Sequence, residues 1–172
     1  SLLNKKVKVI NADAFSWMMK NTQKFDAVIV DFPDPSNFSI GKLYSNSFYK
    51  LLNRSLEHKG IAVIQSTSPF VAPKSFWCVN ETLLASGFKT VPYHNFVPSF
   101  GEWGYIMAMK DSAHNWYAKL PAGLRFSSTQ SIEQMLFFPE DMKPRLPLEV
   151  NKLNNQALVN YFEEEWNKYL DI

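Results

Sequence analysis

The sequence predicts an α/β fold with a largely parallel sheet and a helical appendage. The first observation is that short β-branched apolar runs alternate with stretches of helical periodicity, an order that implies right-handed crossovers between parallel strands. The second is that acidic or amide side chains directly follow these runs. The third is size, because 172 residues with 46% hydrophobic content can bury one sizeable core.

The chain opens with a predicted strand, an acidic turn, a helix and a second strand. Residues 7–10 form a short apolar strand, and Asp13 leads into an amphipathic helix over residues 14–20. Residues 28–30 form a strand of the buried type, and a loop rich in Asp and Pro follows it. No glycine-rich turn of the kind that cradles a nucleotide occurs in this region, so we expect the chain to start partway into the sheet.

The middle of the chain predicts another round of helix and strand. A helical stripe covers residues 43–56, and Gly60 is expected to end it and to open a strand over residues 61–65. Residues 73–86 then predict a helix, which Gly87 ends. This order again places a crossover helix between sheet strands.

Two further strands and a last helix complete the prediction. Residues 88–95 and 103–109 are expected to pair antiparallel and to close the sheet edge, and Gly101 and Gly104 indicate a tight turn with close backbone approach. Residues 152–170 keep helical spacing of apolar side chains, so one face of this helix must dock. We therefore divide the chain into a core over residues 1–110 and a C-terminal helical extension over residues 111–172, packed on that core.

Charge and cysteine content exclude several classes of protein. The formal net charge is +2, from 18 basic and 16 acidic residues that form no block, so we expect no nucleic-acid partner. Cys78 is the only cysteine, which rules out a disulfide within the chain and favours a reducing, cytoplasmic compartment. None of His58, His94 and His114 has a second ligand at metal spacing, so no metal site is predicted.

Two carboxylates follow the second strand, in the segment Asp31-Phe32-Pro33-Asp34-Pro35. One interpretation is that Asp34 caps a turn beside Pro35 while Asp31 simply ends the strand. The other is that both point into a cleft, because ligands of open α/β sheets bind at the carboxyl ends of the strands. One carboxylate would then act as a general base and the other as an ionic anchor for an ammonium group.

Asp13 and Gln65 come at the ends of two other predicted strands. Asp13 is expected to cap the following helix, to contact an adenine or ribose, or both. Gln65 is expected either to satisfy a turn or to face the same cleft as the two carboxylates. Aromatic side chains gather around these segments, and core packing is the favoured interpretation for Phe48 and Trp77. The aromatic set comprises Tyr44, Phe48, Tyr49, Phe70, Phe76 and Trp77.

Three ordered motifs give the chain a resemblance to the polyamine aminopropyltransferases, the spermidine synthase family. The family's strand that ends in Asp, two residues and Asp-Pro is matched by residues 31–35. Its Leu-Tyr run leading to Phe-Tyr is matched by residues 43–49, and its Ile-Pro-Thr-Tyr segment running into Trp-Gly-Phe is similar to residues 97–105. Residues 63–105 look closer still to a bacterial branch in which the synthase-like domain follows a hydrophobic membrane region.

The resemblance implies a Rossmann-like sheet of the S-adenosylmethionine-dependent methyltransferase type, truncated at its N-terminus. It also implies transfer of an aminopropyl group from decarboxylated S-adenosylmethionine to putrescine or a related amine. Asp31 would take the proton from the attacking amine, and Asp34 would hold the substrate with Gln65 and Tyr44. Asp13, with Ala14 beside it, would meet the adenine of the co-substrate.

Departures from the family pattern limit what the resemblance implies. Phe100 stands where the family has a tyrosine, and the family's glycine-rich donor loop and N-terminal hairpin have no counterpart. We therefore expect the fragment alone to be inactive. Two alternatives stay open: an S-adenosylmethionine-dependent methyltransferase, and a non-catalytic domain that binds nucleotides or polyamines. A homodimer and a tether at the inner face of the membrane are further expectations for the full-length parent.

Overall fold

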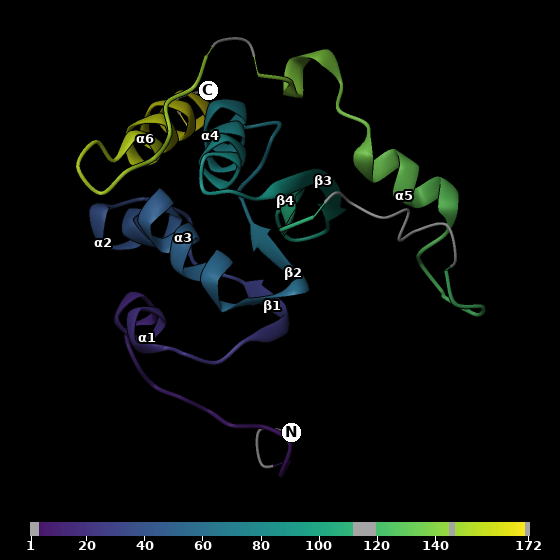
Figure 1. The fold of residues 1–172 in the computed structure, drawn as a ribbon. Helices are drawn as coiled ribbons and strands as arrows, with labels where there is room; N and C mark the ends of the chain where they lie inside the picture. Colours follow the sequence, from purple (N-terminus) through teal and green to yellow (C-terminus); the bar gives the residue numbers. More distant parts are fainter. Residues whose placement is uncertain (1–3, 112–119, 145–146, 171–172) are drawn as a thin grey trace.

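The computed structural model describes residues 4–111, 120–144 and 147–170, and confirms the predicted α/β class. Helices and strands alternate through most of the chain (Figure 1). In order, the elements are α1 (Ala14–Lys20), β1 (Phe25–Val30), α2 (Phe38–Gly41), η1 (Lys42–Tyr44), α3 (Asn46–Ser55), β2 (Leu56–Gln65), α4 (Pro73–Leu84), β3 (Lys89–Val97), β4 (Gly101–Met109), α5 (Thr129–Leu136), η2 (Glu140–Met142) and α6 (Ala157–Leu170).

The four strands form one sheet in the order β1-β2-β4-β3. Of the neighbouring strands, only β1 and β2 pair in parallel, whereas β4 pairs antiparallel with both β2 and β3. The predicted antiparallel pair of β3 and β4 is confirmed. Three of the four described strands run in one direction, as predicted, but β4 lies between β2 and β3, so two of the three pairings are antiparallel. The reason is that β3 and β4 are joined by a tight turn at Gly101, which has φ of +78° and leaves no room for a crossover helix.

Residues 7–10 do not form the predicted strand. Their apolar side chains are about half exposed, with Val9 at 58%, and the described sheet offers them no partner strand. An apolar run that pairs with no neighbour gains neither ladder hydrogen bonds nor burial, so strand propensity alone does not order it. In Figure 1 this purple segment runs away from the body of the molecule below α1.

Helix boundaries also differ from the prediction where side chains compete for backbone groups. Ser45 separates η1 from α3 because its hydroxyl accepts the N–H of Phe48 at 3.3 Å as an N-cap. Gly60 does not end α3, which stops at Ser55, but lies within β2 where any side chain would meet the Phe25 carbonyl at 2.8 Å. The last helix starts at Ala157, five residues later than predicted.

One face of the sheet carries the hydrophobic core. Ala62, Ile64, Ile106 and Ala108 face α3 and α4 and are fully buried. Phe48, which the sequence favours as a core residue, lies in this cluster, and Trp77 packs against it, so the preference for core packing is confirmed for both. Phe76 also belongs to the cluster. The opposite face is much more open, and Ile29 on β1 is 81% exposed there. Successive residues along β1 and β2 therefore point alternately toward the buried core and toward the open face.

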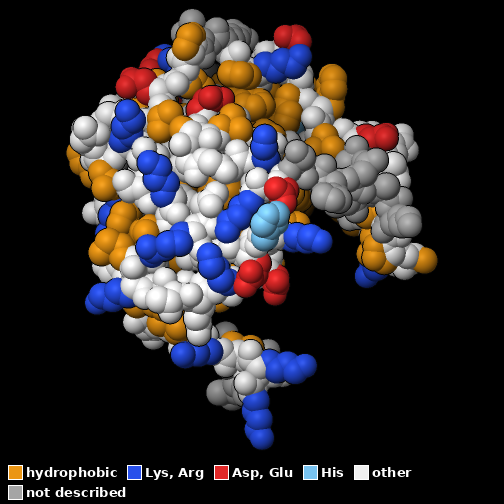
Figure 2. Space-filling view, viewed as in Figure 1, with side chains coloured by type: hydrophobic (Ala, Val, Ile, Leu, Met, Phe, Trp, Pro, Cys, Tyr) orange, Lys and Arg blue, Asp and Glu red, His pale blue; other side chains and the backbone are white. Residues whose placement is uncertain are grey.

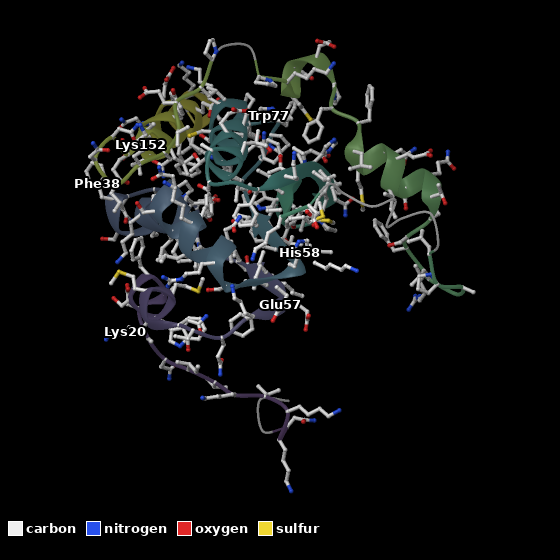
Figure 3. The ribbon with its side chains drawn as sticks, viewed as in Figure 1. Lys20, Phe38, Glu57, His58, Trp77 and Lys152 are labelled. Carbon is white, nitrogen blue, oxygen red and sulfur yellow. The ribbon has the colours of Figure 1, made fainter. Side chains whose placement is uncertain are left out.

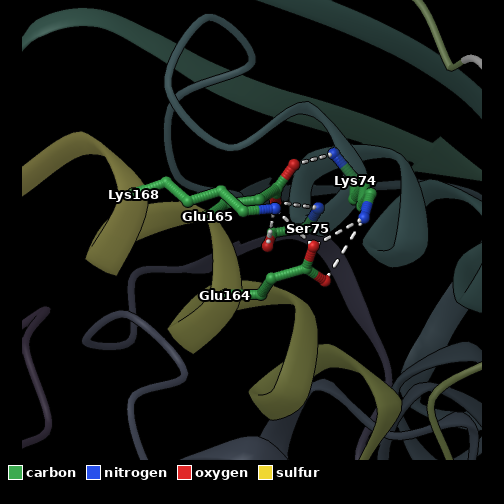
Figure 4. Close-up of polar contacts among 5 residues, drawn as sticks. All are labelled: Lys74, Ser75, Glu164, Glu165 and Lys168. Atoms are coloured by element: carbon green, nitrogen blue, oxygen red, sulfur yellow. Dashed lines mark hydrogen bonds and ion pairs between the residues drawn. The ribbon is translucent and has the colours of Figure 1, made fainter.

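Helix α6 docks on α4 through the segment Glu164-Glu165, as Figure 4 shows. The Glu165 carboxylate accepts the backbone N–H groups of Lys74 at 2.8 Å and Ser75 at 3.0 Å, and the Ser75 hydroxyl at 2.8 Å. These N–H groups belong to the first turn of α4, whose N-cap residue Ala72 has no side-chain acceptor. Glu165 thus caps a helix that lies about ninety residues earlier in the sequence.

Helix α5 is less closely associated with the body than the other described helices. In Figure 1, α5 stands apart at the right, and its described contacts are with β3. Trp77 projects from α4 toward the residues after α5 (Figure 3), where its indole N–H donates to the Met142 carbonyl at 2.6 Å. The predicted boundary at residues 110–111 stays a prediction, and His114 lies outside the described residues.

Figure 2 shows Lys and Arg side chains spread over the visible face, without a single basic block. Within the described residues, no helix is both long and apolar enough to cross a membrane.

Candidate functional site

A cleft of about 910 Å³ lies over the carboxyl ends of β1 and β2. Val30 and Ile64 pair in the parallel register, so the residues that follow these two strands leave the sheet side by side. Asp31, Asp34 and Gln65 all line this cleft. The structure therefore brings together three of the four residues that the sequence placed at one sheet edge, all except Asp13. Glu57 and His58 lie at the opposite end of β2 (Figure 3).

Asp31 is the open member of the acidic pair. Side chains alternate along a strand, so Asp31 continues the exposed face of Ile29 rather than the buried face of Val30. The carboxylate is exposed to solvent and lines the cleft. A group in this position can both approach a reacting amine and release a proton to water.

Asp34 is the closed member of the pair. Its side chain is half-buried, and its Oδ1 atom is buried without a hydrogen-bond partner among the described residues. Burial raises the pKa of Asp34 above its usual range, and the neighbouring Gln65 amide opposes that rise. The turn is held by the backbone carbonyl of Asp34, which accepts the Ser36 N–H at 2.7 Å. The Asp34 carboxylate therefore does not accept the hydrogen bond that closes this turn.

Gln65 links the acidic loop to the neighbouring strand. Its amide nitrogen donates to the Phe32 carbonyl at 3.1 Å, and its amide oxygen accepts the Trp103 indole N–H at 2.7 Å. Both alternatives from the sequence are therefore partly right, because the amide satisfies backbone and also lines the cleft.

Tyr44 lies under the acidic loop instead of in the cleft. Its side chain is 1% exposed, and its hydroxyl lies 3.1 Å from both the Phe32 and Pro33 carbonyls, to which it donates. Burial and the two nearby aspartates raise its pKa, so the hydroxyl stays protonated and acts as a donor. The expected direct contact with substrate is not supported by this placement. Tyr44 supports the loop that carries the two carboxylates.

Aromatic side chains form the other walls of the cleft, but they are not those that the sequence suggested. Tyr93 and Tyr105 stack with centroids 5.3 Å apart across β3 and β4, and Phe100 packs against Trp103 at the same distance. Trp166 of α6 joins them. Strand alternation could have identified Tyr93 and Tyr105, whereas no sequence signal indicates that Trp166 reaches this edge.

Asp13 and Ala14 lie elsewhere. Asp13 caps α1 by accepting the Ser16 N–H at 2.8 Å and pairs with the Lys42 ammonium at 3.0 Å. These contacts, first with Ser16 and then with Lys42, lower the pKa of Asp13 to about 2. Neither residue lines the cleft of the acidic pair, and Ala14 instead lines a separate pocket of about 340 Å³ with residues such as Lys8 and Trp17. Asp13 does not share a sheet edge with Asp31 and Asp34, because residues 7–10 form no strand. Its contact with adenine stays a prediction.

Metal ligands are not gathered in the part of the chain that the structure describes. No group of three or more His, Cys, Asp or Glu side chains there could hold a metal ion. The buried thiol of Cys78 donates to the Glu149 carbonyl at 3.2 Å. Burial raises the pKa of Cys78 to about 12, so the thiol is neither a nucleophile nor a ligand at neutral pH.

Comparison with known proteins gives consistent results. A model of the spermine/spermidine synthase domain matches residues 1–119. The polyamine aminopropyltransferase of Leptospira interrogans is 48% identical over 171 residues, which cover 99% of this chain and 34% of that protein. Polyamine aminopropyltransferase 2 of Ralstonia nicotianae is 52% identical over 169 residues, covering 96% of this chain and 32% of that protein. The chain thus spans about a third of the length of these curated relatives.

Solved structures show the same fold. A crystal structure of spermidine synthase in complex with the transition state analogue AdoDATO has a TM-score of 0.59 and 17% sequence identity, covering 97% of this chain and 53% of that one. Spermidine synthase from Thermotoga maritima has a TM-score of 0.58 and 16% identity, with coverage of 97% and 52%. At these identities the likeness shows the fold.

Proposed function

Because the chain belongs to the spermine/spermidine synthase family, we propose that it carries the amine-binding side of an aminopropyltransferase active site. The reaction is transfer of an aminopropyl group from decarboxylated S-adenosylmethionine to putrescine or a related amine. The amine nitrogen forms a bond to the aminopropyl carbon while the carbon–sulfur bond breaks. The sulfonium sulfur leaves as the neutral thioether of methylthioadenosine, and the amine proton passes to Asp31.

The observation that carries this proposal is the unequal burial of two carboxylates in one cleft. Asp34 is half-buried beside Gln65, a position that suits an ionic anchor for the ammonium end of a diamine. Asp31 is exposed on the same loop, a position that suits a base for the opposite, neutralised amine. Two carboxylates with different surroundings can divide such roles between them.

The aromatic walls support a cationic and partly apolar substrate. A diamine has charged ends joined by methylene groups, and aromatic faces accommodate both ammonium and methylene groups. Tyr93, Tyr105 and Trp103 provide such surfaces next to the carboxylates. Phe100, at the position of the family tyrosine, lines the cleft without a hydroxyl, so any hydrogen bond from that position is lost.

Decarboxylated S-adenosylmethionine is proposed as the co-substrate on the basis of the family and of its charge. The sulfonium group is positive, and the exposed carboxylate of Asp31 would face it favourably. Asp13 and Ala14 remain our candidates for the adenine contact. A homodimer, a membrane tether and a cytoplasmic location of the active site likewise remain predictions.

Calorimetry of amine binding tests the proposal. The intact protein is titrated with putrescine and spermidine, in the presence and absence of methylthioadenosine. Asp34→Ala is expected to weaken amine binding by about tenfold or more, because a hydrogen-bonded charge pair is lost. The matched control is Asp26→Ala, an exposed carboxylate on β1 that does not line the cleft. Equal binding by both variants would contradict the assignment of Asp34.

A further inference from the structure

Helix α5 and the segment that follows it, residues 137–142, are held on the body of the molecule at β3. Among the other elements, α5 makes its main contacts with β3. In the segment, Phe138 is buried, and its ring packs against Trp77 at 5.2 Å between centroids and against His94 at 4.7 Å. The Trp77 indole also donates to the Met142 carbonyl at 2.6 Å. His94 is thus the β3 side chain on which the segment docks.

The two ring nitrogens of His94 each lie against an oxygen atom. Nε2 lies 2.7 Å from the backbone carbonyl oxygen of Phe137, and Nδ1 lies 2.5 Å from the Oε1 atom of Glu102 on β4. The ring is largely buried, with 11% of the His94 side chain exposed and 26% of the Glu102 side chain. One imidazole therefore joins β4 to the segment 137–142.

This arrangement requires a proton on both nitrogens of His94. A carbonyl oxygen can only accept a hydrogen bond, so Nε2 carries a hydrogen. A neutral ring with that hydrogen would turn the lone pair of Nδ1 toward the carboxylate of Glu102, and two acceptors repel each other at this distance. A proton between Nδ1 and Oε1 removes the repulsion, and it belongs to the ring because imidazole is a stronger base than a carboxylate. In this arrangement His94 is an imidazolium ion.

The charged groups around His94 have the sign that suits an imidazolium ion. Glu102 faces the ring from β4, and the exposed Glu133 of α5 lines the same hollow as His94, of about 380 Å³. On the side of α4, the rings that pack on Phe138 carry no charge. Tyr93, the neighbour of His94 on β3, points to the opposite face of the sheet, where it lines the cleft. Both described carboxylates near the ring therefore favour its protonated form.

We propose that His94 and Glu102 form a pH-sensitive latch, which holds α5 and the segment 137–142 on β3 while the ring is protonated and releases them when the proton is lost. Protonation and docking stabilise each other, so docking is favoured at low pH and weakens as the pH rises through the titration of the ring. Loss of the proton replaces a charge-assisted hydrogen bond by two facing acceptors, so the ratio of docked to released molecules should fall by about tenfold or more. Neither residue lines the cleft, so the latch does not depend on the proposed function.

Trp77 reports the docked state, because its indole contacts the segment 137–142. Its resonance is followed by ¹⁹F NMR of the intact protein labelled with fluorotryptophan, from about pH 5 to about pH 9, a range that spans the titration of histidine. Trp77→Phe assigns the resonance. We expect the wild type to show the docked resonance at low pH and to lose it as the pH rises. His58→Gln is the matched control and should respond as the wild type does, because His58 is an exposed histidine that pairs with Asp111. A wild-type resonance that does not change with pH would overturn the latch.

Two further variants separate a proton-dependent latch from packing alone. In Glu102→Gln, the amide N–H can donate to Nδ1 of a neutral ring while Nε2 still donates to the Phe137 carbonyl, so this variant should stay docked at high pH, where the wild type is released. His94→Phe keeps a ring that can pack on Phe138 but has no nitrogen atoms, so it should be released at every pH. The same pH dependence in Glu102→Gln as in the wild type would overturn the proposal. Full docking of His94→Phe would also overturn it, because packing would then suffice.

Discussion

Glu165→Ala removes the acceptor that joins α6 to α4, and its cost can be worked from the structure. Two backbone N–H groups and one hydroxyl lose a carboxylate that they contact at 2.8 to 3.0 Å. A helix N-cap contributes about 1 kcal/mol, and a hydrogen bond to a charged group about 1.5–3 kcal/mol. Burial opposes this gain, since it raises the pKa of Glu165. The free energy of unfolding should therefore fall by about 2–4 kcal/mol.

Urea unfolding of the intact protein, followed by tryptophan fluorescence, measures this change. With a urea m-value of about 2 kcal/mol/M, the midpoint should fall by about 1–2 M. Glu164→Ala is the matched control on the next residue, because Glu164 makes only exposed ion pairs with Lys74 and Lys168. Such pairs contribute about 1 kcal/mol or less. Equal midpoints for the two variants would refute the reasoning that Glu165 caps α4.

Two further predictions concern the close packing of Gly104 and the titration of Asp34, each with a matched control substitution. Gly104→Ala should destabilise the fold by about 3 kcal/mol, because its Cβ would lie 2.5 Å from the buried Phe76 ring. Gly101→Ala should cost about 1 kcal/mol, because only its positive φ opposes a side chain. A larger loss of thermal stability in Gly101→Ala than in Gly104→Ala would contradict this reasoning. Burial raises the pKa of Asp34 in the folded protein, so its contribution to stability is present at low pH and lost as pH rises through the raised pKa. Asp34→Asn should therefore gain stability relative to wild type as the pH rises from below the ordinary carboxyl pKa to above the raised pKa of Asp34, and Asp26→Asn should not. Parallel pH profiles of the denaturant midpoints of wild type and Asp34→Asn would contradict the assignment.

The sequence predicted correctly those elements that are stabilised by contacts between residues close together in the chain. The run before Asp31 is apolar and the segment after it contains two prolines, so the strand and its loop could be predicted together. Asp13 as the cap of α1 and Gly87 after α4 followed from the same kind of short-range chemistry. The strand at residues 7–10 could not be judged in this way, because a strand depends on a neighbour that its own sequence does not specify.

The sequence predicted only those residues of the candidate site that directly follow a strand. Asp31, Asp34 and Gln65 follow two parallel strands, and their convergence is a consequence of that pairing. Tyr44 was harder, because an aromatic hydroxyl near a loop can either face the cleft or support the loop from below. Glu165 contacts the first turn of α4 across about ninety residues, and Trp166 lines the cleft from the same helix. No spacing in the sequence indicates either position.

Asp31 is tested most directly as the general base by the rate of aminopropyl transfer in the intact protein after Asp31→Asn. Methylthioadenosine formation is measured with decarboxylated S-adenosylmethionine and putrescine, with Asp26→Asn as the control. Loss of a positioned general base should slow kcat by about 10²–10⁴-fold, with amine binding by Asp34 retained. This loss is expected in Asp31→Asn and not in Asp26→Asn. An unchanged rate in that variant would contradict the assignment of Asp31 as the base.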